Sequence, residues 1–202
     1  MIRNIIRFVV ILGLCCLVMG GGVAVLYAVF KADLARRDNE AREFAIREVA
    51  PEGSTVDLQK PIAGQPFADD AVYVAVIGDK PAAYTAGGEA TGYSSTVRVM
   101  VSVRAADRKV QKIVVVSQNE TPGLGTRVAE SRSNFTLWDK IFGARETEQL
   151  FNPFLGQFAG KSPAEFKDVH AITAATITSN ATKRAAEQAI ERIQKALEKM
   201  RP

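Results

Sequence analysis

The longest apolar run lies near the start of the chain. Residues 8–30 read FVVILGLCCLVMGGGVAVLYAVF and contain no charged side chain. About 20 apolar residues cross the hydrocarbon core of a bilayer as a helix. The apolar part of a cleaved signal peptide is about 7 to 15 residues long and ends at a site with small residues, which this run lacks. The pattern therefore predicts an uncleaved transmembrane anchor over residues 1–30, in which Cys15 and Cys16 are small apolar residues.

The segment after the anchor changes to a mixed, mostly polar composition. Residues 32–50 are rich in helix formers and stop before Pro51, which predicts a helix that continues out of the membrane as a stalk. Residues 53–70 contain several turn-forming residues and are predicted to be a linker or irregular structure. We therefore expect a juxtamembrane helix and linker over residues 31–70, followed by one folded domain over residues 71–202.

Three β-favouring runs open this domain. Residues 72–77 read VYVAVI and end at a Gly-Asp turn, with Tyr84 on the predicted return strand. In the run TVRVMVSV, the residues at 97, 99, 101 and 103 are all valine, so they lie on one face of a strand. A short turn then leads to VQKIVVV at 110–116. These two runs predict an antiparallel hairpin whose valine face covers a core.

Helical signals occupy the C-terminal part of the chain. Ser162 and Glu165 have the spacing of a capping box, with Pro163 at the first helical position. Apolar residues then recur at helical spacing, at Ala185, Ala189, Ile193, Leu197 and Met200. We expect this stripe to pack on the sheet. The predicted fold class is therefore α+β: an N-terminal transmembrane helix, then a domain with an antiparallel sheet and packed helices.

Composition excludes several classes of function. The chain has 202 residues, one histidine and two adjacent cysteines, too few ligands for a Cys/His zinc site and no framework for disulfides. Its 26 basic and 22 acidic residues are interleaved, so the net charge of +4 is weak support for nucleic-acid binding, and no nucleic-acid partner is expected. We find no Ser-His-Asp set, phosphate-binding Gly-Lys loop or metal ligand set, and assign no catalytic or metal-binding residue.

Two segments remain as candidates for chemistry. Residues 120–125 read ETPGLG, where proline and glycine hold the two central positions of a type II turn. Residues 171–180 read AITAATITSN and precede the C-terminal helix. Their hydroxyl groups suit a structural helix cap, but a helix start is also where a phosphate binds, because free N–H groups and the positive helix end face it. His170, just before, is interpreted as a surface spacer.

The two motifs together resemble a known family. ETPGLG, the stretch NPFLGQFAGKS at 152–162 and a later Thr-x-Ala-Thr-x-Thr-Ser element occur in this order after an N-terminal anchor. This arrangement resembles the FMN-binding domain family of the G subunit of Rnf electron-transport complexes. The C subunit of Na⁺-translocating NADH:quinone oxidoreductase is related and remains an alternative.

The resemblance implies a set of flavin-binding residues. The family's flavin-bearing threonine maps onto Thr176, which would carry FMN covalently through a phosphoester bond. Residues near the phosphate, or in the signal that a flavin transferase reads, would be Ala174, Ala175, Thr178 and Ser179. The loop of Glu120, Thr121, Pro122, Gly123, Leu124 and Gly125 would help to form the flavin pocket, with the isoalloxazine ring against Leu124.

One position departs from the family pattern. Where the family has glycine before Ala-Thr, this chain has Ala174. A left-handed backbone at this residue would cost about 1–2 kcal/mol, whereas an ordinary backbone would cost nothing.

The resemblance also implies a function and a location. The chain would be a flavoprotein subunit that relays electrons in an ion-translocating ferredoxin:NAD⁺ oxidoreductase, without a complete active site of its own. It would be a single-pass protein of the cytoplasmic membrane with its FMN domain on the extracytoplasmic side. Its partners would be the other Rnf subunits, a flavin transferase and membrane lipid. A different class also stays open, a membrane-anchored structural or binding module in which both motifs serve only the fold.

Overall fold

The computed structural model describes residues 2–130, 132–133 and 150–200. The chain divides into two compact units, Met1–Glu40 and Ala41–Pro202, which are described separately. The first unit is the N-terminal part of helix α1 (Ile2–Val49), and α1 is long and apolar enough to cross a membrane. This agrees with the apolar run found in the sequence.

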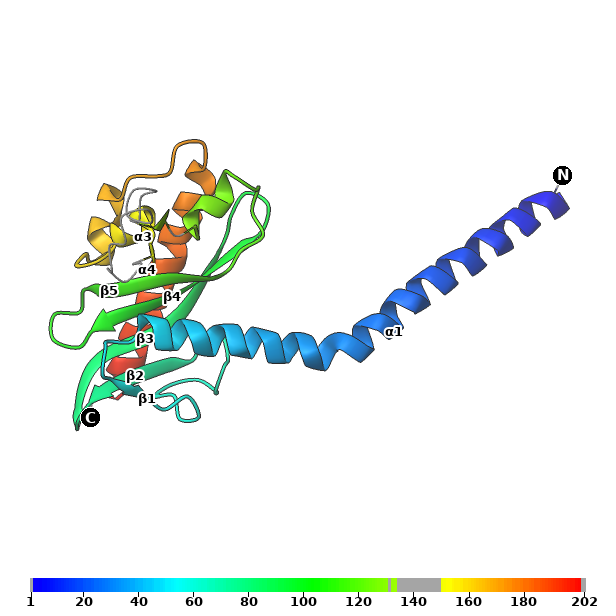
Figure 1. Ribbon diagram of the computed structural model, residues 1–202. Helices are drawn as coiled ribbons and strands as arrows, with labels where there is room; N and C mark the ends of the chain where they lie inside the picture. Colours follow the sequence, from blue (N-terminus) through cyan, green and yellow to red (C-terminus); the bar gives the residue numbers. More distant parts are fainter. Residues whose placement is uncertain (1, 131, 134–149, 201–202) are drawn as a thin grey trace, which may run out of the picture. The chain divides into compact units, whose positions relative to one another are not determined.

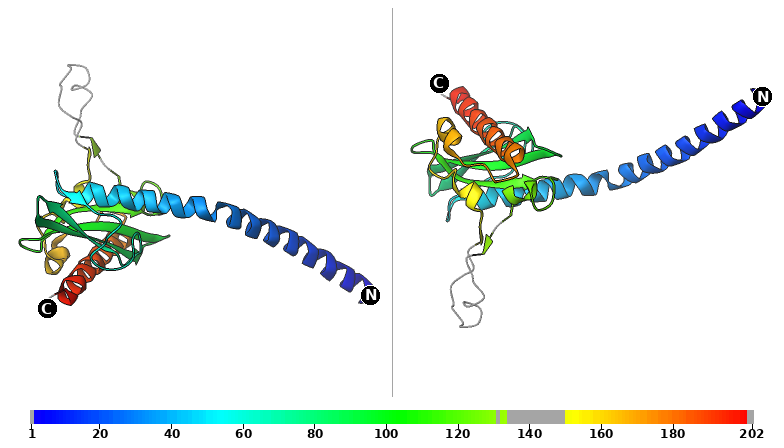
Figure 2. Two further views of the ribbon diagram at one scale, coloured as in Figure 1. Left: turned by 90° about the horizontal axis from the view of Figure 1, so that it is seen from below. Right: turned by 90° about the horizontal axis from the view of Figure 1, so that it is seen from above.

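The second unit is built on a five-stranded antiparallel sheet (Figures 1 and 2). Its strands follow one another in chain order: β1 (Thr55–Val56), β2 (Val72–Ile77), β3 (Lys80–Thr91), β4 (Thr96–Arg104) and β5 (Val110–Ser117). The strand over 72–77, the return strand bearing Tyr84 and the hairpin of β4 and β5 are thereby confirmed. Two further short strands, β6 (Arg132–Ser133) and β7 (Leu150–Phe151), pair with each other.

Helical elements follow the sheet in the chain. Among the described residues after β5 they are the 3₁₀ helix η1 (Gly125–Val128), α3 (Pro153–Gly156), the 3₁₀ helix η2 (Pro163–Asp168) and α4 (Thr176–Lys199). The predicted capping box is present at η2, where Glu165 accepts hydrogen bonds from the backbone N–H and the hydroxyl of Ser162.

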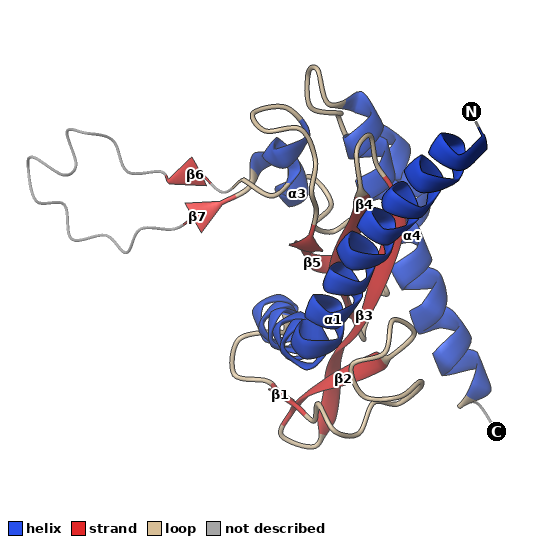
Figure 3. Ribbon diagram, turned by 90° about the vertical axis from the view of Figure 1, so that its right-hand side faces the viewer, coloured by secondary structure: helices blue, strands red, loops and turns tan. Residues whose placement is uncertain are grey.

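Helix α4 covers one face of the sheet (Figure 3). The four alternating valines of β4 are buried with Ala185, Ala189 and Ile193 of α4, as the pattern predicts. The stripe ends earlier than expected, because Leu197 is only half-buried and Met200 is exposed. The helix approaches β3 closely at Gly88, where an added Cβ would lie 2.0 Å from the Ala185 carbonyl oxygen. Only glycine permits this approach.

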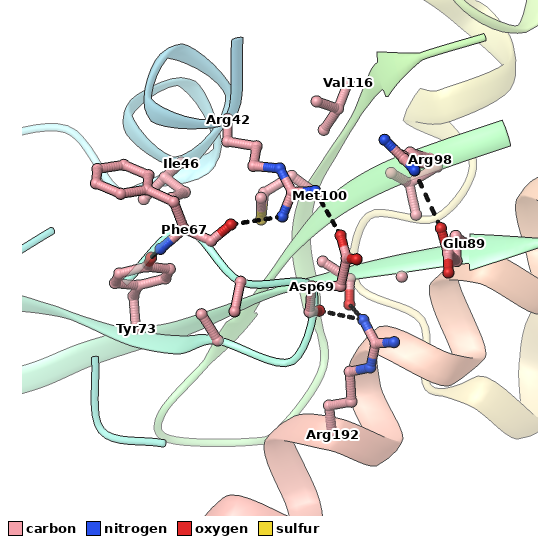
Figure 4. Close-up of a pocket in the computed structure, with 15 residues that line it drawn as sticks. Arg42, Ile46, Phe67, Asp69, Tyr73, Glu89, Arg98, Met100, Val116 and Arg192 are labelled. Carbon is pink, nitrogen blue, oxygen red and sulfur yellow. Dashed lines mark hydrogen bonds and ion pairs between the residues drawn. The ribbon is translucent and has the colours of Figure 1, made fainter. Parts of the chain in front are cut away.

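The opposite face of the sheet packs against the last turns of α1. A second apolar cluster contains Ala45, Ile46, Val49, Leu58, Ala71, Tyr73 and Met100. Arg42 adds polar contacts, since its guanidinium donates to the Phe67 carbonyl at 2.8 Å and pairs with Asp69 (Figure 4). From α4, Arg192 donates to the carbonyl oxygens of Asp69 and Gly87. The end of α1 is therefore part of the folded unit.

The segment over 53–70 is mostly irregular, as predicted, but it is paired with the sheet at two places. Strand β1 pairs with β2 through Thr55–Val76 and Val56–Ala75, and Ala63 forms a bridge to Val72. The local sequence is rich in turn residues, but these long-range backbone pairs hold it along the edge of β2. The compact unit therefore begins at Ala41 and includes residues assigned from the sequence to stalk and linker.

Candidate functional site

The ETPGLG segment follows β5 and forms the expected tight turn. The Leu124 N–H donates to the Thr121 carbonyl at 3.2 Å, and Gly123 has a φ of 73°. This is the left-handed backbone that glycine adopts without a steric penalty. The turn leads directly into η1, and Pro122, Gly123 and Leu124 are exposed at its tip.

Glu120, which opens the motif, is buried rather than presented to solvent. Its side chain is 4% exposed. One carboxylate oxygen, Oε2, accepts from the Tyr93 N–H at 3.1 Å and from the Thr178 hydroxyl at 2.7 Å. The other, Oε1, accepts from the N–H groups of Ser94 at 3.1 Å and Ser95 at 2.9 Å. A single carboxylate thus joins the β3–β4 turn, the ETPGLG loop and the first turn of α4.

Two glycines make room for this carboxylate. A Cβ at Gly92 would lie 2.5 Å from Glu120 Oε1, and one at Gly125 would lie 2.6 Å from Glu120 Cβ and 3.0 Å from Thr178 Oγ1. Real Cβ atoms do not approach other atoms so closely, so larger residues at either position would displace Glu120. Close packing around the buried Glu120 carboxylate therefore explains why residues 92 and 125 are both glycine.

The hydrogen bonds around Glu120 favour its ionised form. Burial raises the pKa of the carboxyl, but the bonds donated by the Thr178 hydroxyl and by the backbone of Ser95, Ser94 and Tyr93 outweigh burial. The pKa therefore lies below its usual value. The carboxylate is charged at neutral pH, so it accepts hydrogen bonds and donates none.

The start of α4 carries an exposed threonine. Ala175 occupies the N-cap position and supplies no side-chain cap, and Thr176 is the first helical residue. The first backbone bond of the helix is donated by Ser179 to Ala175 at 2.9 Å. The N–H groups of residues 176–178 precede that bond, and such groups are free to bind an anion.

The other hydroxyls of the motif are directed inward. Thr178 and Ser179 are buried, and Thr178 donates to Glu120. The Ser179 hydroxyl accepts from the Ile172 N–H at 3.0 Å, which fastens the preceding loop to the helix. The motif's hydroxyls therefore do not cap the first turn of α4, and the structural-cap interpretation is wrong for this helix.

Ala174 adopts the left-handed backbone that the sequence left open. Its φ is 65°, in a turn closed by the Ala175 N–H donating to the Ile172 carbonyl at 2.9 Å. The residue is exposed, so its methyl group gains no compensating burial. The family's glycine at this position is explained by this geometry, and alanine here is strained.

The structure brings most of the predicted residues together. Glu120, Gly125 and Thr178 are in contact, and Thr176 lies on the same helical turn as Thr178. His170 is exposed, and its backbone N–H and carbonyl are held by Gln157, consistent with a spacer.

The sequence reasoning missed the β3–β4 turn at Gly92–Ser95. Gly92, directly before Tyr93, is the one local residue type in the sequence that indicates a turn there.

Comparison with known proteins agrees with this geometry. Residues 92–191 match the FMN-binding domain family. This match confirms the resemblance indicated by the motifs. The matched range includes the β3–β4 turn, the ETPGLG loop and most of α4.

Two kinds of curated relative resemble the chain. The G subunit of the proton-translocating ferredoxin:NAD(+) oxidoreductase complex of Clostridium ljungdahlii is 31% identical over 121 residues, 60% of this chain and 58% of that protein. The G subunit of the ion-translocating oxidoreductase complex of Pseudomonas aeruginosa is 34% identical over 140 residues, 65% of each chain. The chain thus matches less than two thirds of the length of either relative.

A solved structure is also similar. The crystal structure of Shewanella oneidensis NqrC aligns with a TM-score of 0.47 and 20% sequence identity, covering 76% of this chain and 72% of that one.

Proposed function

We propose that this chain is a membrane-anchored flavoprotein subunit that relays electrons through FMN bound covalently to Thr176. The observation that carries the proposal is the start of α4, where an exposed threonine hydroxyl stands beside backbone N–H groups without a side-chain cap. A phosphate esterified to Thr176 would lie where those donors and the positive end of a 24-residue helix stabilise it.

The residues at the start of α4 are arranged in a way that suits bound FMN. When bound, FMN supplies the reversible electron transfer that the side chains of this domain do not provide. Ala174 and Ala175 turn the chain so that Thr176 begins the helix, Ser179 holds that turn, and Thr178 connects it to Glu120. A covalent tether keeps the local concentration of the cofactor high even where the pocket is shallow.

The relatives support a proposal for the assembly. By analogy with the G subunits that the chain resembles, we place it in an ion-translocating ferredoxin:NAD⁺ oxidoreductase complex of the Rnf type, as a subunit of a redox-driven translocase. Helix α1 would anchor it in the cytoplasmic membrane as a single-pass subunit, in contact with lipid and the other subunits. The domain would lie on the extracytoplasmic side, where a flavin transferase would modify Thr176. In this proposal residues 1–30 anchor the chain, residues 31–70 connect the anchor to the domain and residues 71–202 bind FMN, with residues 41–70 packed in the same compact unit as the domain.

The tether is tested on the full chain produced with a flavin transferase. After denaturing electrophoresis the band should fluoresce under ultraviolet light, and the intact mass should exceed that of the polypeptide by one FMN phosphoester. Thr176→Ala should abolish both signals, since it removes the attachment oxygen. Thr182→Ala is the matched control on the same helix, because that hydroxyl is buried and donates to the Thr178 carbonyl.

The outcomes separate the candidate functions. A wild-type band without fluorescence would favour a structural or binding module. Fluorescence retained by Thr176→Ala but lost by Thr178→Ala would move the attachment site. Ferredoxin-dependent NAD⁺ reduction by the intact complex would distinguish the Rnf assignment from a quinone-reducing one.

A further inference from the structure

A row of side chains crosses the sheet on the face opposite α4 (Figure 2). Its members lie directly opposite one another on four neighbouring strands: Tyr73 on β2, Thr85 on β3, Ser102 on β4 and Lys112 on β5. Residues paired in this way point to the same face of a sheet. Tyr73, at one end, packs in the apolar cluster that includes the end of α1, and Lys112, at the other end, pairs with Glu48 of α1 at 3.3 Å. The last turns of α1 therefore cover this row.

The two hydroxyl groups in the middle of the row are buried without a partner. Thr85 and Ser102 are both 0% exposed. Neither hydroxyl forms a hydrogen bond with any residue that the structure describes. A buried hydroxyl without a hydrogen bond is unfavourable relative to the same group in water. Covering the row with α1 therefore opposes part of the gain from burying apolar side chains there.

The end of α1 is held on the sheet by few contacts. Within residues 42–49, the buried side chains are Ala45, Ile46 and Val49. Two ion pairs add to them, and these are Arg42–Asp69 and Glu48–Lys112. Three of these four charged side chains are more than a third exposed, and ion pairs that water reaches contribute little to stability. Helix α4, by contrast, buries ten residues against the other face.

We propose that residues 42–49 form a strap that releases from the sheet while the strands and α4 stay folded. Release hydrates Thr85 and Ser102, and this offsets part of the cost of exposing three apolar side chains. With the strap docked, α1 runs directly into the packed unit. Once the strap is released, the chain between α1 and β2 is no longer fixed on this face of the sheet. The strap thus sets how tightly the anchor helix is joined to the domain, and it does not depend on a bound flavin.

Thiol labelling measures the release. Ser102→Cys places a thiol under the strap, and Val101→Cys places one on the other face of the same strand, in the cluster that α4 covers. Both are made in the full chain with Cys15→Ala and Cys16→Ala, held in detergent and reacted with an aromatic disulfide reagent. The thiol at position 102 should react at least about tenfold faster than the thiol at position 101. Its rate should change little at low urea concentrations, because a local opening exposes little surface.

The unpaired hydroxyl is tested by removing it without changing the shape of the side chain. In the Ser102→Cys protein, Thr85→Val should slow labelling by about fivefold, because the docked state no longer buries that hydroxyl. Thr182→Val is the matched control, since the Thr182 hydroxyl is also buried but donates to the Thr178 carbonyl at 2.9 Å. It should not slow labelling at position 102.

The ion pair of the strap is tested in the same way. Arg42→Gln breaks the pair with Asp69, so it should speed labelling at position 102 and leave labelling at position 101 unchanged. Arg47→Gln is the matched control, because its pair with Glu43 lies within α1. This variant should leave both rates unchanged.

Two results would overturn the proposal. Equal labelling at positions 101 and 102, with the same dependence on urea, would mean that both thiols become exposed only when the whole unit unfolds. An unchanged rate at position 102 in Thr85→Val would refute the role of the unpaired hydroxyls in release. If Val101→Cys does not fold, Val99→Cys takes its place, since Val99 is buried in the same cluster.

Discussion

Replacing Ala174 by glycine should stabilise the domain. The left-handed backbone of this residue, at a φ of 65°, costs an L-amino acid about 1–2 kcal/mol relative to its ordinary conformations. Glycine removes this cost but loses about 0.4–1 kcal/mol through the greater freedom of its unfolded chain. Because Ala174 is exposed, its methyl group contributes little burial that the change would forfeit. The net gain should be about 0.5–1 kcal/mol.

Thermal unfolding measures this gain. For a unit of this size, about 1 kcal/mol corresponds to a rise in Tm of about 2–4 °C. The full chain in detergent would be heated while circular dichroism is recorded, with Ala174→Gly compared with wild type. Ala171→Gly is the matched control, since Ala171 is exposed in the same loop and is not among the residues with positive φ, so its Tm should fall. An unchanged or lower Tm in Ala174→Gly would refute the argument that this turn is strained.

Two further predictions concern packing and pH. Gly88→Ala should destabilise the domain by about 1–3 kcal/mol, because the new Cβ would clash with the Ala185 carbonyl. Gly156→Ala, at a position with open space, should show no such loss in the same denaturant titration. The lowered pKa of Glu120 stabilises the fold fully above the unfolded pKa, and this contribution disappears as pH falls through the folded pKa. Acid unfolding curves below about pH 4.5 should therefore be flatter in Glu120→Gln than in wild type, and parallel curves would contradict this assignment.

The strands and α4 could be predicted because their signals are local. Alternating valines specify one buried face of β4, and small residues at helical spacing specify the stripe of α4 that meets it. The turn at Gly123 follows equally from its own residue types. These features need no knowledge of distant parts of the chain.

The features that escaped prediction depend on contacts between distant residues. Glu120 bonds to Thr178, 58 residues later, and to Tyr93, 27 residues earlier. No periodicity within the ETPGLG loop indicates that its carboxylate turns inward. The order in residues 53–70 has the same origin, because a two-residue strand such as β1 exists only through its pairing with β2.

The short pairing along β2 also affects how the domain meets other molecules. An uncovered strand edge offers free N–H and carbonyl groups to any extended chain and promotes aggregation. In this domain β1 covers one end of β2, and the bridge at Ala63 covers the other. The chain between them forms no regular strand of its own. Residues 53–70 therefore protect this edge of the sheet from pairing with another extended chain.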